Sequence, residues 1–149
     1  MGSAVSTKEE VIEFLAAFPG EDEGDLEELD AVLARAFSLL QDDEVDAAVF
    51  GVFERYPDED GMGVYWSIVH GLEHRRDYEA GLVASVRRAP SQFGATMLNR
   101  LKNGGHDTCA GEDILELLRE ISKSSTASAD TKRVALMFLD HQQRRSAEP

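Results

Sequence analysis

The chain has 149 residues, a length that suits one domain with its own hydrophobic core. Apolar residues make up 42% of it and charged residues 30%, which is ordinary for a folded protein, but its formal net charge of −14 is strongly acidic. A chain with this charge repels nucleic acid and anionic membranes, so we expect its partner to be a basic protein surface.

The negative charge is concentrated in the N-terminal part of the sequence. Residues 1–60 contain 18 acidic and three basic side chains, for a net charge of −15. Residues 61–149 contain 11 acidic and 12 basic side chains, for a net charge of +1. An acidic region of this kind serves either as a solubilising surface or as an interaction surface, and the sequence leaves both interpretations open.

The cysteine content and the hydropathy of the chain indicate its cellular compartment. The single cysteine, Cys109, excludes an internal disulfide bond and fits a reducing environment. No apolar run approaches the roughly 18–20 residues that span a bilayer. The chain does not open with the charged and apolar segments of a secretory signal. We therefore expect a cytoplasmic protein.

Apolar residues recur along the chain at intervals of three and four, which is the period of an amphipathic helix. Ser6 and Glu9 have the spacing of a capping box at the first helix, and Asp25 has the position of a cap for the second. Asp42-Asp43 opens the third predicted helix, and Pro90-Ser91 starts the sixth. The predicted helices cover about residues 7–18, 25–40, 42–56, 64–72, 77–88, 91–103, 112–123 and 130–143.

These elements predict an all-α fold in a single helical domain over residues 1–149, with a frayed tail at about residues 144–149. No segment shows sustained strand alternation with hairpin turns. Short links between helices force antiparallel neighbours, and a spacing of about 30–45 residues between helix pairs is typical of a HEAT-like stack. An orthogonal bundle is the alternative architecture. The sequence does not define the oligomeric state.

The segment His70-Gly71-Leu72-Glu73-His74 matches H-x-x-E-H, the pattern of inverted zinc proteases. Two histidines four residues apart share one helix face and could bind one metal ion. The third ligand would have to be Glu112, Glu116 or His141. The alternative interpretation is a helix C-terminus, where histidine and arginine favour the negative end of the helix dipole. Because Gly71 weakens the helix that would hold the ligands, we expect no metal site and no zinc hydrolase.

Other candidate sites are also weak. Cys109 lies too close in sequence to His106 and Asp107 for a Cys–His catalytic pair. The glycine pair 104–105 follows no predicted strand and lacks the Lys-Ser or Lys-Thr of a phosphate-binding loop. No basic stripe with interleaved aromatic residues indicates nucleic-acid binding. The sequence therefore predicts a protein without catalytic residues or a cofactor.

Three acidic clusters, at residues 21–23, 42–46 and 58–60, lie at predicted loops and helix starts. If consecutive helices stack in order, some of these clusters share one rim of the stack. Aromatic residues beside the third cluster would anchor a partner that the carboxylates attract, although Trp66 could also be partly buried between helices. The predicted partner-binding residues are Asp42, Asp43, Glu44, Asp46, Tyr56, Asp58, Glu59, Asp60, Tyr65 and Trp66.

Packing motifs between Asp43 and about Leu139 point to a family. They are Glu44-Val45-Asp46-Ala47-Ala48-Val49-Phe50-Gly51, Phe53-Glu54-Arg55-Tyr56-Pro57, Val69-His70-Gly71-Leu72-Glu73, Arg88-Ala89-Pro90, Met97-Leu98-Asn99-Arg100 and Ile114-Leu115-Glu116-Leu117-Leu118. This segment, about two thirds of the chain, resembles the small helical immunity proteins encoded beside bacterial polymorphic toxins of contact-dependent and type VI competition. The first 42 residues have no part in the resemblance.

The resemblance implies that the protein binds and blocks a cognate toxin in the cytoplasm. It implies no catalytic residues in this chain, because immunity proteins of this kind have none. Its negative charge adds an independent expectation, because an acidic inhibitor can cover the basic substrate cleft of a toxin such as a nuclease. A helical-repeat adaptor for another protein is the alternative function, and a zinc hydrolase is a further one.

Overall fold

The computed structural model describes residues 7–20, 23–39, 42–75 and 77–147. Within these residues, eight α-helices account for most of the chain, together with a short 3₁₀ helix and one two-stranded antiparallel hairpin. The fold is therefore all-α, as predicted. The elements are α1 Lys8–Ala17, α2 Glu23–Leu39, α3 Asp43–Arg55, η1 Gly61–Gly63, α4 Tyr65–Arg75, α5 Glu79–Arg88, α6 Gln92–Asn103, β1 Thr108–Cys109, β2 Glu112–Asp113, α7 Ile114–Ser122 and α8 Ala129–Ala147.

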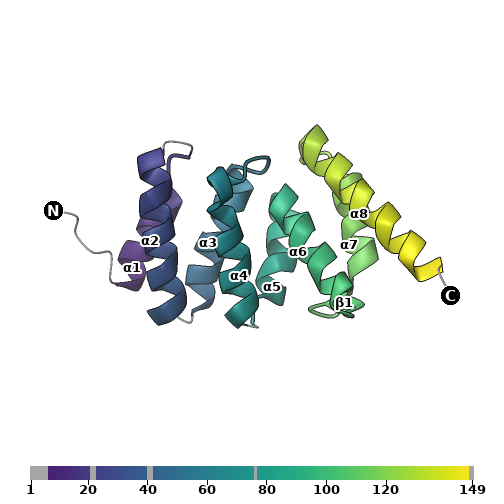
Figure 1. The fold of residues 1–149 in the computed structure, drawn as a ribbon, viewed down its shortest axis with the longest axis horizontal. Helices are drawn as coiled ribbons and strands as arrows, with labels where there is room; N and C mark the ends of the chain where they lie inside the picture. The colour runs from purple at the N-terminus through teal and green to yellow at the C-terminus, as the bar shows by residue number, and fades with distance from the viewer. Residues whose placement is uncertain (1–6, 21–22, 40–41, 76, 148–149) are drawn as a thin grey trace.

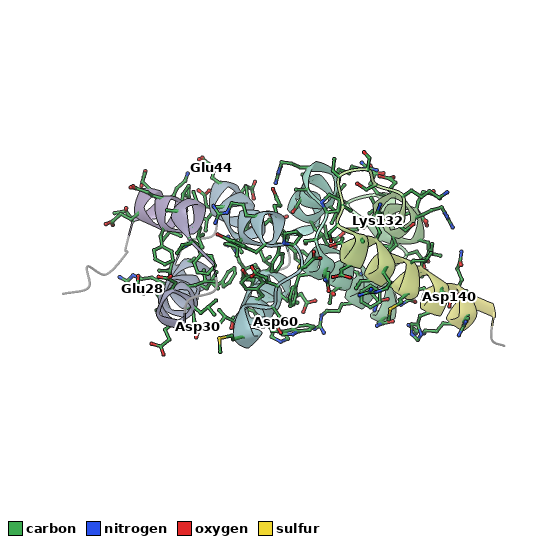
Figure 2. All side chains as sticks on the ribbon, turned by 90° about the horizontal axis from the view of Figure 1, so that it is seen from above. Glu28, Asp30, Glu44, Asp60, Lys132 and Asp140 are labelled. Atoms are coloured by element: carbon green, nitrogen blue, oxygen red, sulfur yellow. The ribbon has the colours of Figure 1, made fainter. Side chains whose placement is uncertain are left out.

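The helices form two layers of a stack. Helices α1, α3, α5 and α7 pack on one another in order, and so do α2, α4, α6 and α8 (Figure 1). Viewed from above, the two layers appear as two rows (Figure 2). Each odd-numbered helix also contacts the even-numbered helix that follows it. This is the arrangement of stacked helical hairpins, so the HEAT-like alternative describes the fold better than an orthogonal bundle does.

Aromatic rings join successive hairpins in the middle of the stack. The rings of Phe53 on α3 and Phe93 on α6 are stacked, with centroids 5.2 Å apart. Tyr65 on α4 contacts both, at 5.8 Å from Phe53 and 5.9 Å from Phe93. Tyr65 is only 1% exposed, so its side chain belongs to the core. Its expected role as a partner-binding anchor is not compatible with that burial.

The predicted starts of the third and sixth helices are confirmed, and a side-chain cap forms at each. The Asp42 carboxylate accepts hydrogen bonds from the backbone N–H groups of Glu44 and Val45 at the start of α3. The Ser91 hydroxyl accepts from the N–H of Gly94 at the start of α6. In both cases the side chain satisfies backbone donors that have no partner within the helix.

The predicted capping box of α1 is wrong by one residue. The structure places it at Thr7 and Glu10, which have the same spacing: the Thr7 hydroxyl accepts from the Glu10 N–H, and the Glu10 carboxylate accepts from the Thr7 N–H. Ser6, the residue predicted to cap, lies outside the described residues, and Glu9 has no part in the box.

Two further boundaries differ from the prediction. Helix α2 begins at Glu23, so Asp25 lies inside its first turn and is not its cap. Helix α8 continues to Ala147, so residues 144–147 are helical and not frayed. An ion pair between Arg144 and Asp140, 3.0 Å long and one helical turn apart, supports this last segment. Residues 148–149 lie outside the described residues.

Gly71 lets α2 and α4 approach closely. A Cβ atom at this position would overlap the aromatic ring of Phe37 on α2. Gly51 on α3 has the opposite surroundings, because a Cβ atom there would have no neighbour within 4 Å. The two glycines are therefore a matched pair, one required by packing and one not.

We predict that Gly71→Ala destabilises the protein by about 1–3 kcal/mol, because the added methyl group overpacks the α2–α4 contact. We predict that Gly51→Ala stabilises it by about 0.5–1 kcal/mol, because alanine is the better helix former. Urea denaturation followed by circular dichroism measures both. Stabilisation by both substitutions would contradict the close packing of α2 on α4.

Candidate functional site

The second and third acidic clusters lie at opposite ends of α3. Asp42–Asp46 form the start of this 13-residue helix, and Asp58–Asp60 follow its end, about 20 Å away. The third cluster instead shares a rim of the stack with the α1–α2 link, since Gly20 lies against the Tyr56 ring. Glu21 and Asp22 of the first cluster lie outside the described residues. The second cluster therefore does not share a rim with the third.

Most of the second cluster serves the fold. Asp42 caps α3, and the Lys8 ammonium group lies 3.0 Å from the Asp42 carboxylate and 2.9 Å from that of Glu44. This ion pair joins the first helix to the third. Asp43 is exposed, and Glu44 keeps most of its side chain in solvent. These two carboxylates of the cluster remain the most accessible to a partner, while Asp42 keeps 31% of its side chain in solvent.

Asp46, predicted to bind a partner, is buried instead. It is 6% exposed and forms an ion pair with Arg75, which joins α3 to α4. Burial raises the pKa of the Asp46 carboxyl group, while the charge of Arg75 acts in the opposite direction. A carboxylate enclosed in this way cannot contact a partner without breaking the pair.

Tyr56 also has an internal partner. Its hydroxyl group donates a hydrogen bond of 2.9 Å to the carbonyl oxygen of Phe18 at the end of α1. The neighbouring Arg55 guanidinium donates to the carbonyl oxygens of Leu15, at 2.6 Å, and of Ala16. Together the two side chains donate to carbonyl groups at the C-terminal end of α1, where partners within the helix run out. Tyr56 is half-buried in this role.

A cavity of about 590 Å³ opens on the rim of the stack that carries the third cluster. Its size falls in the range of ordinary ligand and side-chain pockets. Carboxylates, aromatic rings and the exposed η1 loop form its walls. The residues that line it are Gly20, Leu26, Asp58, Glu59, Asp60, Gly61, Met62, Tyr65, Gln92 and Phe93; we call this the acidic pocket.

Asp58 fixes one wall of the acidic pocket. Its Oδ1 atom accepts hydrogen bonds from Gln92 Nε2 at 2.9 Å, Ser128 Oγ at 2.7 Å and Thr131 Oγ1 at 3.0 Å. These bonds join the α3–α4 loop to α6 and α8. Partial burial opposes the ionisation of Asp58, but the three hydrogen bonds outweigh it and lower the pKa of the carboxyl group.

The η1 loop presents an apolar side chain beside the carboxylates. The Asp60 carboxylate, labelled in Figure 2, accepts a hydrogen bond of 3.0 Å from the Met62 N–H. Met62 has φ +52°, a left-handed conformation rare outside glycine, and its side chain is 72% exposed. The conformation is unfavourable for methionine and leaves its flexible thioether in solvent.

Trp66 lies on α4 next to this loop. Its ring packs edge-on against Phe93 at 5.2 Å and is stacked with His70 at 5.9 Å. The Arg100 guanidinium lies 5.7 Å from its centroid. Trp66 is therefore partly buried, yet 38% of the residue stays exposed. A ring held on one side and free on the other is suited to anchoring a partner.

The H-x-x-E-H segment has other contacts. Both oxygens of the Glu73 carboxylate accept hydrogen bonds from Arg100, at 2.7 and 2.9 Å. His70 is stacked with Trp66. In the described part of the chain, no three His, Cys, Asp or Glu side chains lie close enough to hold a metal ion. Among the described residues, His70 and His74 therefore have no third side chain near enough to complete a metal site with them.

Sequence reasoning predicted four of the residues that line the acidic pocket and missed the other six, among them Met62 and Gln92. Met62 left a signal, because it is an apolar residue between two glycines inside a charged loop. Gln92 left none, because its contact with Asp58 spans 34 residues and depends on how α6 packs beside the α3–α4 loop.

Comparison with protein-family models, with curated proteins and with solved structures finds no match for this chain. The acidic pocket is therefore interpreted from its own residues. Among the described residues, no helix has the length and apolar character needed to cross a membrane.

We predict that Asp58→Ala destabilises the protein by about 1–3 kcal/mol at neutral pH, because three donors lose their acceptor. Asp58→Asn keeps an acceptor oxygen and should lose less. Because folding lowers the Asp58 pKa, ionised Asp58 stabilises the protein above its unfolded pKa near 4, and this contribution disappears as the pH falls through the folded value. Urea denaturation measured from pH 7 downward should therefore show a stability difference between wild type and Asp58→Asn that is largest at neutral pH and shrinks as the pH falls below 4.

Cys109 is buried in β1, with its Sγ atom 3.6 Å from the carbonyl oxygen of Glu79. Burial and the nearby Glu79 charge raise the pKa of the thiol to about 12. We predict that the native protein reacts with a disulfide reagent such as DTNB at pH 8 about a hundredfold or more slowly than the urea-unfolded protein. Equal rates in the two states would contradict the burial.

Proposed function

We propose that this protein is an immunity protein that binds and neutralises a cognate bacterial toxin. The observation that carries the proposal is the acidic pocket, with Met62 and Trp66 exposed beside it. These two are the exposed large apolar side chains that the described residues present on the N-terminal half of the stack. The toxin would present a basic surface, as the cleft of a nuclease does.

Charge supports the first step of such an association. Residues 1–60 have a net charge of −15, which accelerates the approach of a basic partner. Within the pocket, the carboxylates of Glu59 and Asp60 form no ion pair with another described residue. Their charges remain available to a lysine or arginine side chain inserted from the partner.

Apolar contacts would then supply affinity. Trp66 offers a ring that is already fixed by Phe93, so little conformational entropy is lost when a partner covers it. Met62 offers a flexible side chain that adapts to the partner's shape. An aromatic anchor beside charged groups is the usual composition of an interface hot spot.

The toxin assignment rests on the resemblance to helical immunity proteins, which the stack of short helices accommodates. A helical-repeat adaptor is the second candidate, favoured by the same stacked architecture. The genetic neighbourhood separates the two, because an immunity gene follows directly after a large gene that ends in a toxin domain. An adaptor gene has no such requirement.

The experiment combines co-expression with two matched double variants. Glu59→Gln/Asp60→Asn removes two negative charges from the acidic pocket and keeps an acceptor for the Met62 N–H. Asp43→Asn/Glu44→Gln removes two charges at the opposite end of α3. We expect wild-type protein to co-purify with the product of the upstream gene and to protect growth. The pocket variant should bind about 10–100-fold more weakly, and the control variant within about threefold of wild type.

Failure to bind the upstream product or to protect growth would refute the immunity function. A larger loss in the control variant would move the contact surface to the start of α3. Equal losses would indicate that overall charge, and not the acidic pocket, determines affinity. Circular dichroism of both variants checks that the fold is retained.

A further inference from the structure

The outer face of α8 is apolar at its centre. Leu136 is 56% and Met137 60% exposed, whereas Ala135 and Leu139 point into the stack. A shallow groove of about 400 Å³ runs over this face, and none of its residues lines the acidic pocket. It is lined by Arg133, Leu136, Met137, Leu139, Asp140 and Gln143; we call it the α8 groove.

The two ends of the stack differ in this respect. Helices α1 and α2 form the other end (Figure 1), and their described exposed residues include Glu9, Glu13, Glu27 and Glu28 but no large apolar side chain. A polar outer face is what keeps the terminal unit of a helical stack soluble. The α8 end lacks such a face at its centre, so it is the end that gains from being covered.

The two charges that flank the α8 groove are placed symmetrically and have opposite signs, so the groove is self-complementary. Arg133 lies three residues before Leu136, and Asp140 lies three residues after Met137. All four side chains fall on one helix face, because their spacing of three, four and seven residues follows the helical period. An antiparallel copy of the same helix, centred between Leu136 and Met137, would therefore place Arg133 opposite the partner's Asp140 twice.

We propose that the α8 groove is a homodimer interface, in which α8 packs antiparallel on α8 of a second copy of this chain. The two-fold axis passes between Leu136 and Met137, so each leucine packs against the partner's methionine. Two Arg133–Asp140 ion pairs flank this apolar centre. The contact is self-complementary, as an interface with two-fold symmetry must be.

In the isolated chain the same charges form only exposed pairs within α8. Arg133 lies 2.8 Å from Asp130, and Arg144 lies 3.0 Å from Asp140. Exposed pairs of this kind contribute little to stability, so they exchange readily for contacts with a partner. A head-to-tail contact with the acidic α1–α2 end would leave Leu136 and Met137 without an apolar counterpart, and it would generate open filaments.

The test uses the full chain without any toxin, so its result does not depend on the immunity function. Sedimentation velocity over a range of concentrations should show a monomer–dimer equilibrium for wild type. Leu136→Asp should abolish the dimer. Lys123→Glu, an exposed charge reversal outside the α8 groove, should leave it unchanged.

Charge exchange tests the antiparallel register itself. Arg133→Asp and Asp140→Arg should each weaken the homodimer about tenfold or more, because each places like charges opposite one another. An equimolar mixture of the two variants should form a heterodimer, in which opposite charges face each other again. The double variant Arg133→Asp/Asp140→Arg should also recover the homodimer.

A monomeric wild type would overturn the proposal. A dimer that survives Leu136→Asp would overturn it as well. If the mixed single variants stay monomeric, the antiparallel register is wrong.

Discussion

The contact on which the rest of the structure depends is the aromatic cluster of Phe53, Tyr65 and Phe93. These rings come from α3, α4 and α6, so they join the second hairpin of the stack to the third. Tyr65 and Phe93 also line the acidic pocket, and Phe93 packs edge-on against the Trp66 ring. The same packing that holds the stack together thus forms a rigid base for the candidate site, and preorganisation of this kind limits the entropy lost on binding.

The acidic residues of the N-terminal half divide into two groups by what they contact. Asp42, Asp46 and Asp58 each accept hydrogen bonds or form ion pairs that join separate helices. Glu59 and Asp60 contribute charge to the acidic pocket instead. The excess of carboxylates is therefore neither wholly a solubilising surface nor wholly an interaction surface. This division also explains why removing Asp42 or Asp46 from the second cluster would confound a loss of binding with a loss of stability.

The helices could be predicted from the sequence because burial of one face imposes a period on apolar residues. The all-α fold and the helix starts at Asp42 and Ser91 followed from that period and from local sequence signals, whereas hairpin stacking was one of two architectures that the sequence left open. The site residues were harder to assign. Tyr65 and Trp66 are adjacent, but a helix turns by about 100° per residue, so one points into the core and the other reaches solvent.

Asp46 shows where local reasoning fails. It lies on the same helix face as Val49 and Phe53, which indicates burial, yet its acidic character suggested exposure. Its burial depends on Arg75, 29 residues away, and no local pattern connects the two. Contacts such as this one, and that between Asp58 and Thr131, depend on how the hairpins stack.

The uneven charge of the chain also bears on how two copies could associate. With a net charge of −15 in residues 1–60 and +1 in residues 61–149, two N-terminal halves repel each other, whereas two C-terminal halves do not. Helix α8 lies at the end of the stack remote from α1 (Figure 1). Pairing through α8 therefore keeps the acidic ends far apart, beyond the roughly 8–10 Å over which salt leaves charges unscreened. Electrostatics thus favours the same end of the molecule that the exposed Leu136 and Met137 favour for apolar contact.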